Sequence, residues 1–389
     1  MSHERGPSPE ERIRAEFKAQ GGSPPERDMT PALGTRGGPG RWRRAVEHAP
    51  VAGFQRDWAD ARWSYLYRRD TSYRRAGDDR EVRAAARRMR GGAQPPDTIQ
   101  GPFIHPAVWT WEVPLYFWFG GIATGSAFVG LAADITGERD AATIARRVAL
   151  AAVAPCAPLL VLDLGRPLRF LHMLRIFKPR SPMSMGAWCL SGFSATAGGA
   201  VAAELVGADK LARSLGVATA ALGTYLGSYT GVLLASTAVP VWARSRALLA
   251  PIFVATATAT GAAGCRLALA ASGTAPDDPA RSALEALQIG AMCAELGLSR
   301  LNERRLGPLR SALETGRSRT LFTLAKGAVL AGLGLSAAGR RGARGADHLA
   351  SGLFLGAGLA FRFAWVGAGR NSARDDVAVA RAARRHSAD

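Results

Sequence analysis

A single carboxylate at the edge of an apolar run is the first residue of this chain that could carry chemistry. The run ends with Asp163, the helix pattern breaks at Gly165 and Pro167, and a short basic segment containing Arg169 and His172 follows. An ionisable group near hydrocarbon is costly and is a functional candidate by default. A carboxylate can exchange protons and an imidazole can donate a hydrogen bond, so this segment suits proton exchange with a lipid-soluble molecule.

Acidic and aromatic residues in two other runs complete the candidate set. Glu112 and Tyr116 open the first apolar run, and Tyr225 and Tyr229 lie toward the end of the fourth. The first run starts at the membrane surface where the second one ends, and the fourth run returns to that surface. We therefore expect these side chains to meet near Asp163.

Structural interpretations of the same residues stay open. Asp163 could cap the helix break and pair with Arg166 or Arg169. His172 could be an ordinary interfacial histidine, and Tyr229 could be a packing residue that hydrogen-bonds a backbone carbonyl.

Eight apolar runs supply the helices that would position these residues. The mean hydropathy of +0.00 hides them, because a polar part up to about residue 105 precedes repeated stretches long enough to cross a bilayer. The runs are too long for barrel strands and do not alternate, so the sequence predicts an all-α polytopic membrane protein. The eight expected transmembrane helices cover residues 113–133, 147–164, 184–206, 214–239, 247–271, 282–298, 320–338 and 348–368.

The predicted helices divide the chain into four parts. We expect a polar, partly disordered extension over 1–105, a first four-helix bundle with the candidate site over 106–240, a second four-helix bundle over 241–370, and a basic tail over 371–389. Small residues recur at four-residue spacing in two helices, which lets helices approach closely in lipid. They are Gly121 and Gly125 in the first helix, and Gly223, Gly227 and Gly231 in the fourth.

The formal charge of +19 could suggest a nucleic-acid partner. The basic residues lie in the tail and in short loops, however, and this distribution is typical of membrane topology. The loops on the side of both termini carry about twice as many Lys and Arg residues as the opposite loops. The sequence thus predicts a multi-pass protein of the cell membrane, in contact with lipid and not with nucleic acid, with both termini in the cytoplasm.

Four motifs occur in one order along the first half of the chain. They are Trp111-Glu-Val-Pro-Leu-Tyr-Phe-Trp-Phe-Gly-Gly, Leu162-Asp-Leu-Gly-Arg-Pro-Leu-Arg-Phe, Ser181-Pro-Met-Ser-Met-Gly-Ala-Trp and Tyr229-Thr-Gly-Val-Leu-Leu. Together they resemble the polysulfide reductase membrane-subunit family (NrfD/PsrC type), the quinone-interacting anchors of molybdopterin oxidoreductases. The resemblance implies that Asp163 and Tyr229 lie at a quinone pocket and that Glu112 and Tyr116 border it.

A quinone site needs an apolar slot, hydrogen-bond donors for two ring oxygens and a group that exchanges protons. The expected quinone-binding residues are Asp163, Tyr229, Glu112, Tyr116, His172 and Arg169. None of the six histidines lies in the middle of a predicted span, and the four cysteines form no CxxC pair. We therefore expect no heme, iron–sulfur cluster or metal in this chain, so electrons must pass to a cofactor on another subunit.

The resemblance implies a membrane anchor that is not catalytic alone. It would exchange electrons between menaquinone or ubiquinone and a four-cluster ferredoxin-like iron–sulfur subunit. A molybdopterin catalytic subunit, of a formate dehydrogenase-like or a polysulfide or thiosulfate reductase-like kind, would bind behind that. The alternatives are a purely structural membrane anchor and a secondary transporter. The helix break at Gly165 has no evident counterpart after the sixth run, which disfavours a transporter with inverted repeats.

Four further charged residues fall within predicted spans of the second half. Because lone charges at such depth cost a few kcal/mol each, we expect two structural ion pairs, Arg266–Glu285 and Glu295–Arg362. A proton path through Glu285 and Glu295 is the alternative.

Overall fold

The second and larger part of the chain is a set of long helices. The computed structural model describes residues 104, 109–163, 174–179, 181–341, 345–375 and 379, and these residues are helical or in turns and loops, without a strand. This confirms the all-α prediction. The predicted extension over 1–105 lies outside the described residues except for Ile104, as do Arg166, Arg169 and His172.

The helices alternate with short connections along the chain. They are α5 (Glu112–Thr136), α6 (Arg139–Val153), α7 (Cys156–Asp163), α9 (Pro182–Leu205), α10 (Asp209–Ala235), α11 (Pro240–Arg244), α12 (Arg246–Ala271), α13 (Pro279–Leu306), the 3-10 helix η5 (Gly307–Leu313), α14 (Gly316–Gly339) and α15 (Ala346–Arg374).

Six segments in the described part of the chain are long and apolar enough to cross a membrane. They are α5, α6 together with α7, α10, α12, α14 and α15. The long helices α9 and α13 are less apolar, because α9 is rich in Gly, Ala and Ser and α13 carries ionisable side chains along its length. The prediction of eight spans is therefore confirmed for six segments, and for α9 and α13 it stays a prediction.

Helix boundaries differ from the expected ones where proline or charge intervenes. The second span begins at Arg139 and is interrupted between Val153 and Cys156, next to Pro155, which cannot donate a backbone hydrogen bond. The fourth helix ends at Ala235 and does not continue to Val239, which is extended as expected for a residue directly before a proline. The sixth is longer than expected, because arginines in its last turn are good helix formers that favour the helix C-terminus.

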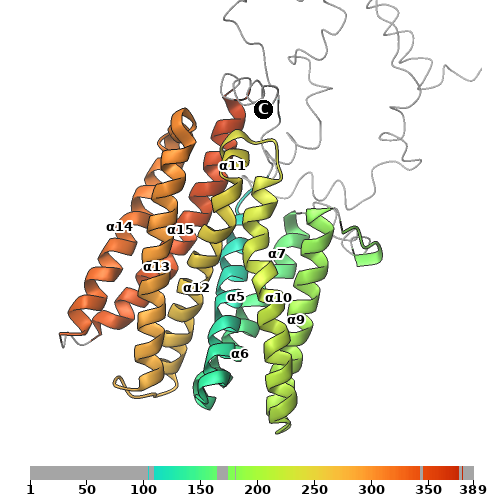
Figure 1. The fold of residues 1–389 in the computed structure, drawn as a ribbon, viewed down its shortest axis with the longest axis vertical. Helices are drawn as coiled ribbons and strands as arrows, with labels where there is room; N and C mark the ends of the chain where they lie inside the picture. Colours follow the sequence, from blue (N-terminus) through green and yellow to red (C-terminus); the bar gives the residue numbers. More distant parts are fainter. Residues whose placement is uncertain are drawn as a thin grey trace, which may run out of the picture. The chain divides into compact units, whose positions relative to one another are not determined.

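Successive long helices run in alternating directions (Figure 1). One end therefore gathers the start of α5, the end of α7, α11, η5 and the end of α15, and we call it the α11 end. Hydrogen bonds join these segments, because Asn371 donates to the carbonyl oxygens of Ala312 and Thr315, and Val241 N donates to the Ser372 hydroxyl. The opposite end holds the α5–α6, α9–α10, α12–α13 and α14–α15 connections, and we call it the remote end.

Glycines bring α5, α10 and α12 into backbone contact at the centre. A methyl group at Gly125 would lie 2.0 Å from the carbonyl oxygen of Ala257, and one at Gly261 would lie 2.3 Å from the Gly125 carbonyl carbon. On α10, a methyl group at Gly231 would lie 2.6 Å from Ala250 N. The predicted small-residue positions thus do let helices pack closely.

The remaining helices pack around this centre in pairs. Helix α6 packs on α5, α9 on α10, α13 on α12, and α14 on α15. Helices α13 and α14, in contrast, touch each other at few positions. The division into two four-helix bundles remains a proposal, whereas the pairing places the candidate residues of α5, α7 and α10 on neighbouring helices.

Candidate functional site

The chain is fixed at the α11 end before α5 starts. The Trp109 ring stacks on the Trp242 ring of α11, with centroids 5.4 Å apart and the planes 21° from parallel. Trp242 Nε1 donates a 2.9 Å hydrogen bond to the carbonyl oxygen of Trp365 on α15. These contacts between three segments hold the first turn of α5 and the acid that it carries in one place.

That acid, Glu112, is the first residue of α5 and is only 1% exposed. Its Oε2 accepts a hydrogen bond from the Thr110 hydroxyl, and its Oε1 has no hydrogen-bond partner among the described residues. The positive end of the helix dipole favours a negative charge at this position. A buried carboxyl oxygen without a partner is nevertheless costly, and it leaves one acceptor free for a ligand.

Tyr116 lies one turn further along α5 and is fully buried. Its ring lies next to the Phe117 ring, with centroids 5.6 Å apart, and it is within electrostatic range of Cys156 on α7, Cys189 on α9 and Tyr229 on α10. Its hydroxyl makes no hydrogen bond to another described residue. Four helices thus surround a phenol whose donor is unused.

Tyr229 is buried on α10, where its ring stacks on Tyr225 with centroids 5.8 Å apart. The ring also lies directly against Gly186 on α9, because a methyl group there would be 2.2 Å from Tyr229 Cζ. The Tyr229 hydroxyl, like that of Tyr116, has no hydrogen-bond partner in the described part of the chain. Gly186 therefore makes room for the tyrosine, a role that the sequence analysis missed although Gly186 stands within one of the quoted motifs.

Asp163 is the last residue of α7 and is partly buried. It lies within electrostatic range of Glu112, and no ion pair joins it to another described residue. The structure therefore brings four of the six predicted site residues, Asp163, Glu112, Tyr116 and Tyr229, to neighbouring positions at the α11 end. The other two, Arg169 and His172, lie outside the described residues.

The first predicted ion pair of the second half is formed. Arg266 Nη2 lies 2.9 Å from Glu285 Oε2. The same nitrogen lies 3.2 Å from Asp347 Oδ2, and Arg340 Nε lies 2.9 Å from Glu285 Oε1. The structure thus places Arg266 and Glu285 in a wider network at the remote end.

The second predicted ion pair is not formed as a direct contact, which corrects the prediction. Arg362 donates through Nη2 to the carbonyl oxygen of Phe253, 3.1 Å away, and its guanidinium carbon lies 3.8 Å from the centre of the Phe253 ring. Glu295 instead accepts a 2.6 Å hydrogen bond from the Ser299 hydroxyl on its own helix. The two side chains are within electrostatic range but turn toward different neighbours.

Comparison with known proteins agrees with the quoted motifs. The family described as Polysulphide reductase, NrfD, matches residues 103–300, just over half of the chain. The match spans α5 to most of α13 and includes all six predicted quinone-site residues. No curated protein matches the chain.

Proposed function

The chain belongs to the NrfD polysulphide reductase family, and we propose that it exchanges electrons between a membrane quinone pool and an iron–sulfur subunit of a larger oxidoreductase. The family implies such partners, and a four-cluster ferredoxin-like subunit with a molybdopterin catalytic subunit would complete the enzyme. Menaquinone and ubiquinone are the candidate quinones. The chain would then take part in one half-reaction, the exchange of electrons with the quinone, and would not be catalytic alone.

One observation carries the proposal for the site. Three helices bring Glu112, Tyr116, Asp163 and Tyr229 together at one end, and the hydrogen-bonding atoms of this group are largely unused by the described residues. Buried polar groups in proteins are normally hydrogen-bonded. Unused donors and acceptors at the end of an apolar bundle are what a ring with two oxygens requires from its pocket.

The chemistry assigns a role to each kind of side chain. Reduction of a quinone to a quinol takes two electrons, which the iron–sulfur subunit would supply, and two protons, one for each ring oxygen. A phenol such as Tyr116 or Tyr229 can donate a hydrogen bond to a ring oxygen and hold it in position. Asp163 and Glu112 can accept protons from the aqueous surface and pass them on, and His172 and Arg169 belong to the proposed site as further donors.

The orientation proposed from the loop charges places the α11 end at the cytoplasmic surface. That end holds the end of α15, and its loops carry most of the interhelical arginines. An iron–sulfur subunit that docks there would be next to the proposed quinone site.

Substitution of Asp163 by Asn in the purified complex tests the proposal. The amide keeps the shape of the carboxyl and removes proton exchange, so we expect quinone-linked turnover to fall by roughly a hundred-fold. Activity of the catalytic partner with an artificial dye should remain, because the dye bypasses the quinone. The matched control is Asp209→Asn, the same change at an exposed position of the remote end. Unchanged quinone turnover in Asp163→Asn, with the complex intact, would instead identify a purely structural anchor.

A further inference from the structure

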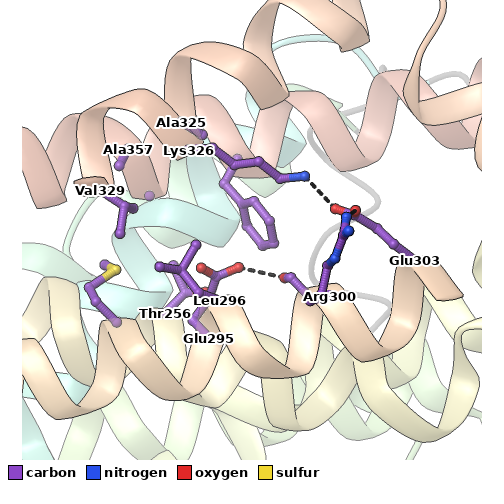
Figure 2. A pocket seen from close by; sticks show the side chains of 13 residues that line it. Thr256, Glu295, Leu296, Arg300, Glu303, Ala325, Lys326, Val329 and Ala357 are labelled. Atoms are coloured by element: carbon purple, nitrogen blue, oxygen red, sulfur yellow. Dashed lines mark hydrogen bonds and ion pairs between the residues drawn. The ribbon is translucent and has the colours of Figure 1, made fainter. Parts of the chain in front are cut away.

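A cavity among the described residues lies outside the site proposed above. A cavity of about 210 Å³ is enclosed by α12, α13, α14 and α15 (Figure 2). Its walls are mainly apolar and include Leu296, Val329 and Phe361. Helices α13 and α14, which line the cavity, touch each other at few positions.

One buried acid points into this cavity. Glu295 is 5% exposed, and only its Oε1 is hydrogen-bonded to another described residue, the Ser299 hydroxyl at 2.6 Å. No cation among the described residues lies within ion-pair distance of it: Arg362 is turned toward Phe253, and Lys326 contacts Glu303. The second carboxyl oxygen of this cavity-lining residue has no hydrogen-bond partner among the described residues, and a ligand with a hydrogen-bond donor would satisfy it.

The mouth of the cavity is polar and partly exposed. Lys326 of α14 reaches across to Glu303 of α13, and Arg300 Nη1 lies 3.5 Å from the same carboxyl group (Figure 2). These two cations are already balanced in part by Glu303, so the site does not favour a free anion. They still offer N–H donors in the lining of the same cavity, and Lys326 is within electrostatic range of Glu295.

The apolar walls, the carboxyl group of Glu295 and the cations that line the cavity together restrict the class of ligand. A lipid acyl chain would fill the apolar volume but would leave the Glu295 oxygen unsatisfied. A cation would gain the carboxylate but would lose its hydration against apolar walls. A flat, neutral ring with oxygen atoms at its edge fits the volume, the donors and the acid together.

We propose that this cavity takes the head group of a second quinone or quinol, with Glu295 and Ser299 at one ring oxygen and the isoprenoid tail leaving between α13 and α14. The ligand class rests on the proposed function, but the site is separate from that of Asp163. Glu295 lies just past the middle of α13, in the half of the helix that leads to the α11 end, so both quinones would be bound in the same half of the membrane.

Photolabelling of the intact complex tests this site. A short-chain azidoquinone is bound in the dark and activated by light, and the labelled peptides are identified by mass spectrometry. We expect label on peptides of α13 and α14 in addition to those of α5, α7 and α10. Excess unlabelled quinone with the same head group should displace both labels, whereas excess phospholipid should displace neither.

Two neighbouring substitutions provide the matched pair of variants. Val329→Phe fills the cavity and should lower labelling of α13 and α14 by at least about ten-fold while leaving the other label unchanged. Leu330→Phe adds the same bulk on the outer face of the same helix, where the side chain is 62% exposed, and should change neither label. Glu295→Leu should weaken labelling of α13 and α14 by roughly ten-fold through the lost hydrogen bonds, which covers the case of a poorly folded Val329→Phe.

The outcomes separate this inference from the proposed function. Label confined to α5, α7 and α10 overturns the second site and leaves the first in place. Label confined to α13 and α14 supports the second site and counts against the first. Label on α13 and α14 that persists in both Val329→Phe and Glu295→Leu, or that phospholipid displaces, overturns the assignment of the cavity.

Discussion

The two ends of the helices treat buried carboxylates differently. At the remote end the acids are paired with arginines that join several helices. Arg146 of α6 lies 2.7 Å from Asp134 of α5 and also contacts Glu204 of α9. In the second half, Arg281 lies 3.1 Å from Asp347, next to the Arg266–Glu285 contact. These networks hold helix ends together.

Toward the α11 end, Glu303 is paired with Lys326 and Arg300, but three other buried or partly buried acids have no such cation in the described part of the chain. Glu112, Asp163 and Glu295 make no ion pair with another described residue. Removing a charge from water without a partner costs several kcal/mol. Such unpaired acids lower the stability of the folded protein, so we expect them at functional sites, where the chemistry requires them. This difference in the pairing of buried acids suggests that the remote end stabilises the protein and that the α11 end binds ligands.

The largest effect on stability should come from breaking a remote network. Arg266→Met removes the cation that contacts both Glu285 and Asp347, and it leaves each acid with one arginine, Arg340 for Glu285 and Arg281 for Asp347. We expect the free energy of unfolding to fall by about 3 kcal/mol. Thermal unfolding of the purified protein in detergent measures this loss.

Two further variants show whether the loss is electrostatic. Adding Glu285→Gln to Arg266→Met should restore part of the stability, because Glu285 Oε2 has lost its partner and only the exposed Arg340 still pairs with this acid. Arg213→Met is the control, since this arginine is half exposed and lies 4.0 Å from Asp134. Equal stability of Arg266→Met and the wild type would contradict a structural role for the remote networks.

The opposite pattern is expected at Glu112. Glu112→Gln keeps the shape and removes an unpaired charge, so the protein should be at least as stable as the wild type. Quinone-linked turnover should fall by roughly a hundred-fold if this acid exchanges protons with the quinone. Steady-state kinetics with quinone and with an artificial dye separate the two effects. Glu138→Gln, at an exposed position of the remote end, is the control. A destabilised Glu112→Gln with normal turnover would reverse the comparison between the two ends.

The sequence predicted best those features that depend on residues close together along the chain. Apolar runs and glycine spacing predicted the helices and their close packing, because both are local patterns. The acid and tyrosines of the first half were predicted to meet, since alternating helix direction brings the ends of α5, α7 and α10 to one surface. The boundaries of α13 were missed, because a helix with a polar buried face continues beyond its apolar stretch.

Side-chain direction was harder to predict than depth. Arg266 and Glu285 lie at matching depths and do pair, whereas Glu295 and Arg362 also lie at similar depths and turn apart. The choice depends on the Phe253 ring and carbonyl, which offer Arg362 a local partner. The cavity beside Glu295 likewise arises from the splay between α13 and α14, and no spacing within one helix records that.

A smaller effect should follow from a change behind Tyr229. Gly186→Ala places a methyl group against the Tyr229 ring and should push that ring out of position, while the rest of the helix pair can adjust. We expect the KM for quinone to rise several-fold with a modest loss of stability. Gly192→Ala on the same helix is the control, because its methyl group would meet Leu222 Cδ1 at an ordinary 3.4 Å. Equal kinetics in the two variants would show that the position of Tyr229 does not matter to quinone binding.

The smallest effect is expected at the buried arginine that has no carboxylate within ion-pair distance. Arg362→Met removes a hydrogen bond and a cation–π contact with Phe253, which together stabilise by about 1–3 kcal/mol, but it also removes the cost of a buried charge with one unpartnered nitrogen. These contributions nearly cancel, so the midpoint of thermal unfolding should stay close to that of the wild type. A loss as large as that of Arg266→Met would mean that Glu295 compensates Arg362 across the space between them. The predicted pair would then act at a distance, and Glu295 would belong with the paired acids of the remote end.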